Sequence, residues 1–347
     1  MKKSKNLIIP IVIVIASVLA AILYSHFTGK SIFSINNNKG NMKVDSDKEV
    51  TIVDLNSKTR PYAVMINNLN EARLVQSGLS KSYLVYELLA EGGITRFLAL
   101  FRDTEVEKIG SVRSARHYYL DYVLENDAIF VHWGWSPQAQ TDIKKLKLQN
   151  IHGLTYEGTY FYRENPLGIA YEHTGFTNTE LLDKARTDLK YPKDTDEGLL
   201  LDYSASSVDL TKYGEVNDAN EVTLSYSNYI VDTYKYDEES KMYARFVGGN
   251  PHVDHNTEEQ LMVKNIIVYS LDYISIAGDE KGRQDLNNIG TGNGYYITEG
   301  KVTPITWKKE KRDSKTIYKF ENGKELIVND GNTFIQILPN TGKVEIN

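Results

Sequence analysis

The chain has 347 residues, enough for one large domain or two ordinary ones, and its 41% hydrophobic and 25% charged content is that of a globular protein. A net charge of −6 without a basic stripe argues against nucleic acid as a partner. The lack of cysteine excludes disulfides, thiolate metal sites, cysteine nucleophiles and lipid attachment to a cysteine.

The N-terminus carries a membrane signal. Three lysines among the first five residues precede residues 7–24, which carry no charge. At ~1.5 Å per residue, a run of ~18–20 apolar residues just spans a bilayer core, and the basic flank stays on the cytoplasmic side. The sequence therefore predicts a transmembrane signal anchor over residues 1–25, single-pass in the cell membrane, with the folded part extracytoplasmic. A signal peptide cleaved after Ala20 is the alternative.

Residues 26–58 are polar and lack a regular pattern, which predicts a tether, and after them strand and helix patterns alternate. Strands are expected at residues 60–68, 83–90, 94–101 and 127–134, with Gly92 and Gly93 allowing a tight turn. Helices are expected from near Ser114, after the cap pair Ser136 and Pro137, and over residues 177–189. This alternation predicts a mixed α/β layered N-terminal domain over residues 59–195.

The second half of the chain has a different pattern. Residues 196–219 are rich in Tyr, Asp, Gly and Ser, and they predict a linker between domains. Short alternating runs follow, separated by turn sequences such as EGK at 299–301 and ENGKE at 321–325, which are typical of hairpins. Residues 220–347 are therefore predicted to form a β-rich antiparallel C-terminal domain, and the predicted fold class is α+β with two domains.

Arginines at the ends of predicted elements are the strongest chemical signal. EGGITR at residues 91–96 and GSVRSAR at residues 110–116 combine one acid with three arginines beside apolar segments. Arginine is preferred where phosphate or carboxylate is bound through two parallel hydrogen bonds, and a serine near a helix start adds donors. The predicted ligand-binding residues, which include a histidine at a strand end, are Glu91, Arg96, Arg113, Ser114, Arg116, His132 and Arg163. The alternative is a structural network in which Glu87, Glu91 and Asp121 neutralise the arginines.

Other chemistry is weaker in this sequence. Glu87 and Glu91 could act as acid and base on a glycoside, but four residues along one strand would separate them by ~13 Å, which is wide for that reaction. HVDH at residues 252–255 is interpreted as a solvated loop cap, so no metal is predicted, and GTGNG at residues 290–294 is interpreted as a turn. No phosphate-binding glycine loop or nucleophile elbow occurs, so no cofactor is predicted and no catalytic residue is assigned.

The motifs RPYAVMINN, GSVRSARHYYLDY, VHWGWSPQA and HVDHNTEEQLMVKNIIV together resemble the YerB-like family of exported bacterial lipoproteins of unknown function. The resemblance runs from about residue 60 to residue 339. It implies two consecutive domains, and it carries over no catalytic residue, because the family has no established activity. The lipid-acceptor cysteine of the family is missing here, which implies that the apolar helix holds this member to the membrane.

These observations predict a membrane-tethered extracytoplasmic protein that binds an anionic cell-envelope ligand through its arginines. A cell-wall polymer, peptidoglycan and a lipid-linked phosphate are the candidate partners. Two alternatives stay open. The first is a hydrolase that acts on envelope carbohydrate through Glu and His groups, and the second is an adaptor that uses the 24 tyrosines and 3 tryptophans as a protein contact surface.

Overall fold

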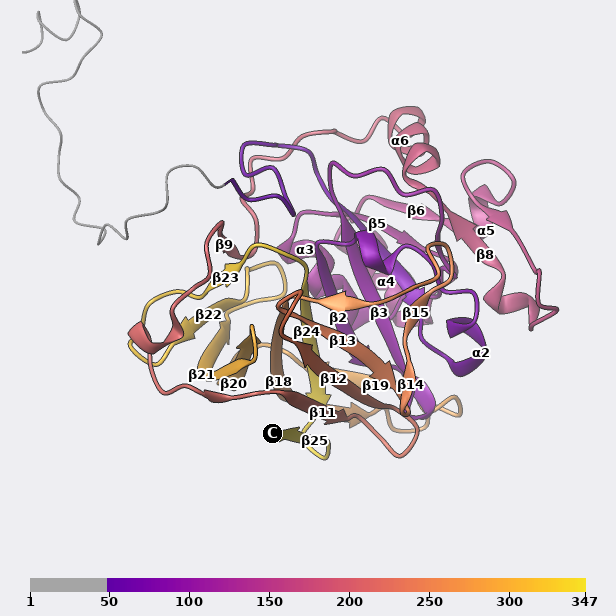
Figure 1. Ribbon diagram of the computed structural model, residues 1–347. Coiled ribbons are helices and arrows are strands. Elements are labelled where there is room, and N and C mark those ends of the chain that lie inside the picture. The colour runs from indigo at the N-terminus through magenta and orange to yellow at the C-terminus, as the bar shows by residue number, and fades with distance from the viewer. Residues whose placement is uncertain (1–48) are drawn as a thin grey trace, which may run out of the picture. The chain divides into compact units, whose positions relative to one another are not determined.

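Residues 49–347 are described by the computed structural model (Figure 1). The predicted anchor over residues 1–25 and most of the predicted tether lie outside the described residues. Within residues 49–347, no helix is both long enough and apolar enough to cross a membrane.

Five strands of the N-terminal half form one end of a large mixed sheet. They are β1 (Tyr62–Asn67), β2 (Leu84–Leu89), β3 (Thr95–Phe101), β5 (Ile129–His132) and β6 (Asn150–His152), in the order β2-β3-β1-β5-β6. β3 is antiparallel to β2 and β1, β5 is parallel to β1, and β6 is parallel to β5. Strands predicted for this half are thereby confirmed. The smaller strands β4 (Ile109–Gly110), β7 (Tyr162–Arg163) and β8 (Gly175–Thr177) form a separate sheet.

The α-helices of residues 49–347 all lie in the N-terminal half: α2 (Asn70–Arg73), α3 (Leu120–Glu125), α4 (Pro137–Lys145), α5 (Gly153–Tyr156) and α6 (Thr179–Asp188). The predicted cap of α4 is confirmed, because Ser136 Oγ accepts a hydrogen bond from the Ala139 amide at 3.2 Å. In α6 the Asn178 side chain accepts from the Leu181 amide at 2.8 Å. These caps satisfy amides that would otherwise lack partners, and they fix where each helix begins.

The helix predicted from near Ser114 begins later, at the start of α3. Ser114 lies in an extended segment, in which the Arg113 amide donates to the Met65 carbonyl at 2.8 Å and the Ala115 amide donates to the Gly134 carbonyl at 2.9 Å. The prediction is wrong because these amides pair with neighbouring strands, which the helical spacing of apolar residues does not reveal. Ser114 is therefore not at a helix N-terminus.

The C-terminal half is rich in strands, as predicted. The large sheet reaches twelve strands through β10 (Asn217–Asp218), β18 (Asn265–Ser275), β19 (Gln284–Asn287), β20 (Gly290–Thr298), β21 (Lys301–Lys309), β22 (Ile317–Phe320) and β24 (Thr333–Pro339). A six-stranded sheet contains β11 (Glu221–Ser225), β12 (Val231–Asp237), β13 (Met242–Val247), β14 (Asn250–Pro251), β17 (Met262–Val263) and β25 (Lys343–Ile346). Two further pairs are β9 (Asp202–Ser204) with β23 (Ile327–Asn329), and β15 (Val253–Asp254) with β16 (Glu259–Gln260).

Two predictions for this half need correction. β24 runs parallel to both β18 and β2, so the half is not purely antiparallel. Hairpin turns join antiparallel strands, whereas a long connection allows a strand to return in the parallel direction. Residues 290–294, interpreted as a turn, form the first part of β20. Gly292 is needed there because a Cβ atom would lie 2.6 Å from Trp307 Nε1, so the glycine makes room for the indole on the next strand.

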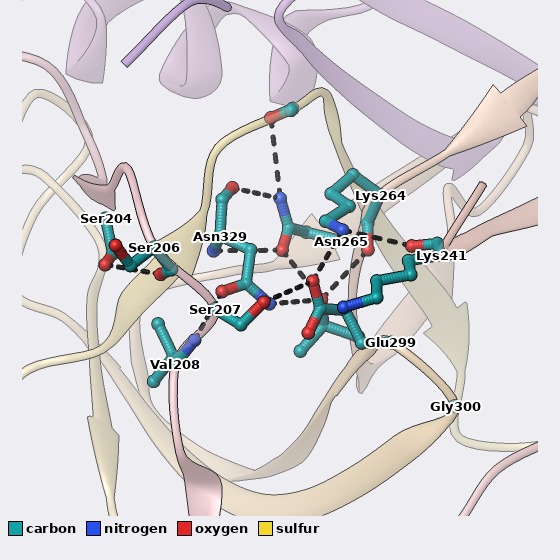
Figure 2. Close-up of polar contacts among 12 residues, drawn as sticks. Ser204, Ser206, Ser207, Val208, Lys241, Lys264, Asn265, Glu299, Gly300 and Asn329 are labelled. Atoms are coloured by element: carbon teal, nitrogen blue, oxygen red, sulfur yellow. Dashed lines mark hydrogen bonds and ion pairs between the residues drawn. The ribbon is translucent and has the colours of Figure 1, made fainter. Parts of the chain in front are cut away.

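The segment predicted as a linker, residues 196–219, packs on the C-terminal half. Figure 2 shows its polar contacts: the Val208 amide donates to Asn329 Oδ1 at 2.7 Å, and Ser207 Oγ donates to Glu299 at 3.0 Å. Asn329 is held in turn by the buried Asn265, whose Oδ1 accepts from the Asn329 amide at 3.2 Å. Because β24 lies between β2 and β18, the two halves share one sheet. The division into domains at this segment stays a prediction.

Apolar residues alternate between the two faces of the large sheet. In β1, Ala63 and Met65 belong to one hydrophobic cluster, whereas Val64 and Ile66 belong to the other. The first cluster includes residues of α3, α4, β21 and β22, and the second includes residues of α6 and of β11 to β13. This part of the sheet is therefore buried on both faces. In mixed folds, sites form where strands end.

Candidate anion-binding site

Glu91 and Arg116 form the centre of a polar cluster. Arg116 donates from Nη2 to Glu91 Oε2 at 2.7 Å and from Nε to Glu91 Oε1, so the pairing is bidentate. Arg96 Nη2 lies 3.7 Å from Glu91 Oε2, and Arg96 Nη1 donates to the Ser114 carbonyl at 2.6 Å. The structure thus brings together four of the seven predicted site residues. One carboxylate faces two guanidiniums.

The backbone around this cluster explains why the four residues meet. Gly92 and Gly93 adopt φ angles of 69° and 73°, which only glycine adopts readily, so the chain turns back directly after β2. Arg96 is the second residue of β3 and pairs across the sheet with Asn67 of β1. A backbone hydrogen bond from the Arg113 amide to the Met65 carbonyl fixes the extended segment that contains Arg116 next to β1. Two stretches separated in sequence therefore converge where β2 ends and β3 begins.

A hollow of about 350 Å³ lies beside the Glu91–Arg116 pair. We refer to it as the arginine pocket, and its lining residues are Glu91, Ser114, Arg116, Trp135, Ser136, Lys281 and Arg283. Lys281 and Arg283 come from the connection between β18 and β19, in the C-terminal half. The sequence did not predict these two residues, and the basic pair around Gly282 is the one local signal that points to them.

Positive charge is in excess in the arginine pocket. Its lining holds three cations and one carboxylate. Arg283 is paired with Asp279 at 2.7 Å, whereas the Lys281 ammonium has no ion-pair partner within residues 49–347. Burial, and then the charge of Arg116, lower the pKa of the neighbouring Arg96 to about 10, so this guanidinium stays charged at neutral pH.

Glu91 remains ionised in this setting. Burial of its carboxyl raises the pKa, but the hydrogen bonds and charge of Arg116, with the charge of Arg96, outweigh burial and lower the pKa below its ordinary value. The carboxylate is 18% exposed, and the side chains of Arg116 and Arg96 are 13% and 5% exposed. The Glu91–Arg116 pair is thus partly accessible from the pocket, whereas Arg96 contacts Glu91 but does not line the pocket.

Two predicted arginines lie outside the arginine pocket, each with an acid of its own. Arg113 Nη2 lies 3.4 Å from Glu172 Oε1, and Arg163 Nε donates to Glu157 Oε1 at 2.6 Å. The Arg163 guanidinium also stacks over the Trp133 ring at 4.4 Å. Neither arginine lines the hollow next to Glu91.

His132 is also outside the pocket. It is completely buried, its Nδ1 donates to the Gly134 carbonyl at 2.8 Å, and its Nε2 lies 3.1 Å from the Asn150 side-chain oxygen. Its ring stacks on Phe130 at 4.7 Å and on His152 at 4.8 Å. Burial lowers the pKa of His132 to about 4, so the ring is neutral at physiological pH. These contacts make it a structural residue of the core.

The two acids considered for glycoside chemistry belong to separate networks. β2 ends at Leu89, so Glu87 and Glu91 do not lie on one strand. Glu87 is completely buried, and its Oε2 accepts a hydrogen bond from Arg245 at 2.7 Å. Asp232 also lies 2.7 Å from Arg245, in the same buried cluster. Glu87 therefore serves the contact between the halves, and it does not face Glu91 across a hollow.

The HVDH motif is built into the fold as well. His252 is buried beside Arg245 and is not solvated, which corrects the loop-cap interpretation for this residue. Asp254 does cap a turn, since its Oδ2 accepts from the Gly78 amide at 2.9 Å and from Ser80 Oγ at 3.0 Å. Within residues 49–347, no group of three or more histidine or acidic side chains is placed to hold a metal ion.

Three larger hollows in the described part of the chain lack the charge excess of the arginine pocket. In the hollow of about 920 Å³ around Asp127 and Asp194, carboxylates outnumber cations. The hollow of about 850 Å³ around Tyr229 has one cation and one carboxylate, and that of about 530 Å³ around Tyr295 has one carboxylate and no cation. Charge therefore singles out the arginine pocket as a place for an anion.

Comparison with known proteins assigns the family. Residues 50–192 match the N-terminal domain, and residues 221–335 the C-terminal domain, of the family described as "Protein of unknown function (DUF3048)". The chain is 31% identical over 293 residues, 84% of each protein, to "Putative lipoprotein YerB" of Bacillus subtilis (strain 168). The crystal structure of YerB from Bacillus subtilis has a TM-score of 0.71 and 30% identity, over 83% of this chain and 94% of that one. The chain thus belongs to the DUF3048 family, and it is similar to YerB over 84% of its length.

Proposed function

We propose that this protein is a membrane-tethered extracytoplasmic binding protein whose arginine pocket holds an anionic cell-envelope ligand. The name of the Bacillus subtilis relative, a lipoprotein, supports attachment to a membrane. In a chain without cysteine, the uncharged run at residues 7–24 takes the place of a lipid as the tether. The folded part then stands on the side where envelope polymers are found.

The charge of the pocket lining carries the proposal for the ligand. Arg116, Lys281 and Arg283 share a small hollow with one carboxylate, Glu91. Glu91 pairs with Arg116 and Asp279 pairs with Arg283, so the exposed Lys281 ammonium supplies the excess positive charge. An anion that enters the hollow can pair with this ammonium and accept hydrogen bonds from the guanidiniums. Ser136, at the N-terminus of α4, adds a hydroxyl to the wall. A phosphate or carboxylate group of a wall polymer, of peptidoglycan or of a lipid-linked phosphate provides this anion.

Thermal unfolding of the full chain with inorganic phosphate tests the proposal. At a hundredfold excess over its dissociation constant, phosphate should stabilise the wild type by ~2.7 kcal/mol. Arg283→Ala and Lys281→Ala should each weaken this stabilisation, because each removes a pocket cation. Lys319→Ala, which removes an exposed lysine of β22 outside the pocket, is the matched control and should leave it unchanged.

Glu91→Gln separates ligand binding from a purely structural role of the cluster. It removes the carboxylate that competes with an incoming anion for Arg116, so the free protein should become less stable while phosphate stabilises it more than it stabilises the wild type. The proposal fails if phosphate shifts the melting temperature of no variant, or shifts that of every variant, pocket and control alike, by the same amount.

A further inference from the structure

A second hollow begins where the arginine pocket ends. The arginine pocket is lined by Glu91 and Arg283, and the hollow of about 850 Å³ is lined by their chain neighbours Gly92, Gly93 and Gln284. We call this second hollow the tyrosine hollow; its lining includes Tyr226, Tyr229, Tyr273, Ser227, Asn228 and Asn340. The two hollows therefore share a wall made of the turn after β2 and the start of β19.

The part of the shared wall that the two glycines of the turn after β2 form carries no side chains. Gly92 and Gly93 carry no side chains, Gly92 is exposed, and a Cβ atom added to Gly92 would meet no heavy atom within 4 Å. A Cβ atom on Gly93 would lie 3.3 Å from both Ser227 and Tyr229. Glycine at these positions therefore keeps the crest between the hollows free of side chains, which leaves room for a ligand to cross it.

The linings of the two hollows differ in a way that fits different parts of one ligand. The arginine pocket offers cations and Trp135, whose ring also stacks on His152 at 3.9 Å and lies 5.5 Å from the His132 ring, between ring centroids. The tyrosine hollow offers aromatic rings, hydroxyls and amides with little net charge, and Tyr229 is 75% exposed. Aromatic surfaces beside hydroxyls and amides suit sugar rings, which have apolar faces and many hydroxyls.

We propose that the two hollows form one binding groove for a linear glycan that carries anionic groups. One charged group lies in the arginine pocket, and the chain passes over Gly92 so that further sugar units lie in the tyrosine hollow against Tyr229. This inference rests on the proposed function for the charged group and adds to it the class of ligand, a chain of at least two sugar units. The shared chemistry is an anion on a sugar chain, whether phosphate or carboxylate.

Binding by the full chain, followed through tryptophan fluorescence, tests the groove. The probes are inorganic phosphate, galacturonic acid, linear oligogalacturonides, a linear oligomeric phosphomannan, and neutral malto-oligosaccharides of the same length. The charged oligomers should bind at least ~10-fold more tightly than galacturonic acid or phosphate, because only they reach the tyrosine hollow. Whichever charged oligomer binds more tightly identifies the anionic group. The neutral oligomers should bind more weakly than both.

Two variants address the groove without touching the charged group. Tyr229→Ala should bring the affinity for charged oligomers down to that for galacturonic acid, and the matched control Tyr295→Ala, an exposed tyrosine in another hollow, should not. Gly92→Asn places a side chain on the crest in a conformation that asparagine tolerates, and should weaken oligomer binding while phosphate binding persists. Melting temperatures of the variants show that they fold.

The outcomes separate the two proposals. If phosphate binds but charged oligomers bind no better than galacturonic acid, the groove is wrong and the proposed function stands. Neutral oligomers that bind as tightly as charged ones would also overturn the groove for an anionic glycan. If neither phosphate nor any charged probe binds, both proposals fall.

Discussion

Arg245→Met tests the buried contact that ties the two halves of the chain together. The Arg245 side chain is completely buried and lies 2.7 Å from both Glu87 on β2 and Asp232 on β12. Burial raises the pKa of Asp232 well above its ordinary value; Arg245 opposes this shift, and the facing Glu87 adds to it. Arg245 therefore contacts both carboxyl groups of this cluster, and the charge of Arg73 also lowers the pKa of Asp232.

Removing the guanidinium leaves two buried carboxyl groups without the partner that they share. Breaking a buried ion pair in this way costs ~3–5 kcal/mol of folding stability. That is a large fraction of the ~5–15 kcal/mol stability of a typical folded protein. Urea unfolding at neutral pH should show this loss for Arg245→Met. Lys235, like Asp232, is on β12, and Lys235→Met breaks an exposed pair with Glu221 of β11, so it should cost less than ~1 kcal/mol.

The pH dependence gives the sign of the effect. A buried carboxyl whose pKa is raised in the folded state contributes stability at low pH, and that contribution is lost as the pH rises through the folded pKa. Because Arg245→Met raises the pKa of Asp232 further, its deficit relative to wild type should be larger at about pH 8 than at about pH 5. Combining it with Glu87→Gln and Asp232→Asn should recover most of the loss. A cost below ~1 kcal/mol, or a cost independent of pH, would contradict the assigned role of Arg245.

Two further predictions concern His132 and the N-terminus. Because the pKa of His132 is lowered to about 4, its neutral form should stabilise the fold by up to ~3 kcal/mol above about pH 6.5, and this should be lost as the pH falls toward 4; an NMR titration midpoint near 6.5 would contradict it. The full chain should stay with membranes after a high-salt wash, whereas a chain that starts at Asp45 should be soluble; mature protein beginning near Ala21 in the culture fluid would rule out the anchor.

Local signals predicted much of the N-terminal half. Ser136 before Pro137 fixed the start of α4, and the double glycine after β2 fixed a turn that carries Glu91 to the arginines. These predictions succeed because capping and positive φ angles are decided by a few neighbouring residues. The helix expected at Ser114 failed because its backbone partners, Met65 and Gly134, are remote in sequence.

Only the residues that the N-terminal half contributes to the candidate site were predictable from the sequence. The Glu91–Arg116 pair lies within one half, where opposite charges at the ends of adjacent apolar segments suggest contact. Lys281 and Arg283 reach the same hollow because β24 joins the halves in one sheet, and no local pattern encodes that pairing. The sequence predicts that Arg113 and Arg163 bind a ligand, but each arginine pairs with a nearby acid. Glu172 pairs with Arg113, and Glu157 pairs with Arg163.

The most direct measurement of the central claim is a crystal structure of the protein soaked in inorganic phosphate. We predict one phosphate in the arginine pocket, within hydrogen-bond distance of Arg116 and Arg283, with the Glu91–Arg116 pair still in place or opened toward the ion. An empty arginine pocket in a crystal that binds phosphate elsewhere would contradict the claim that this pocket is built for an anion.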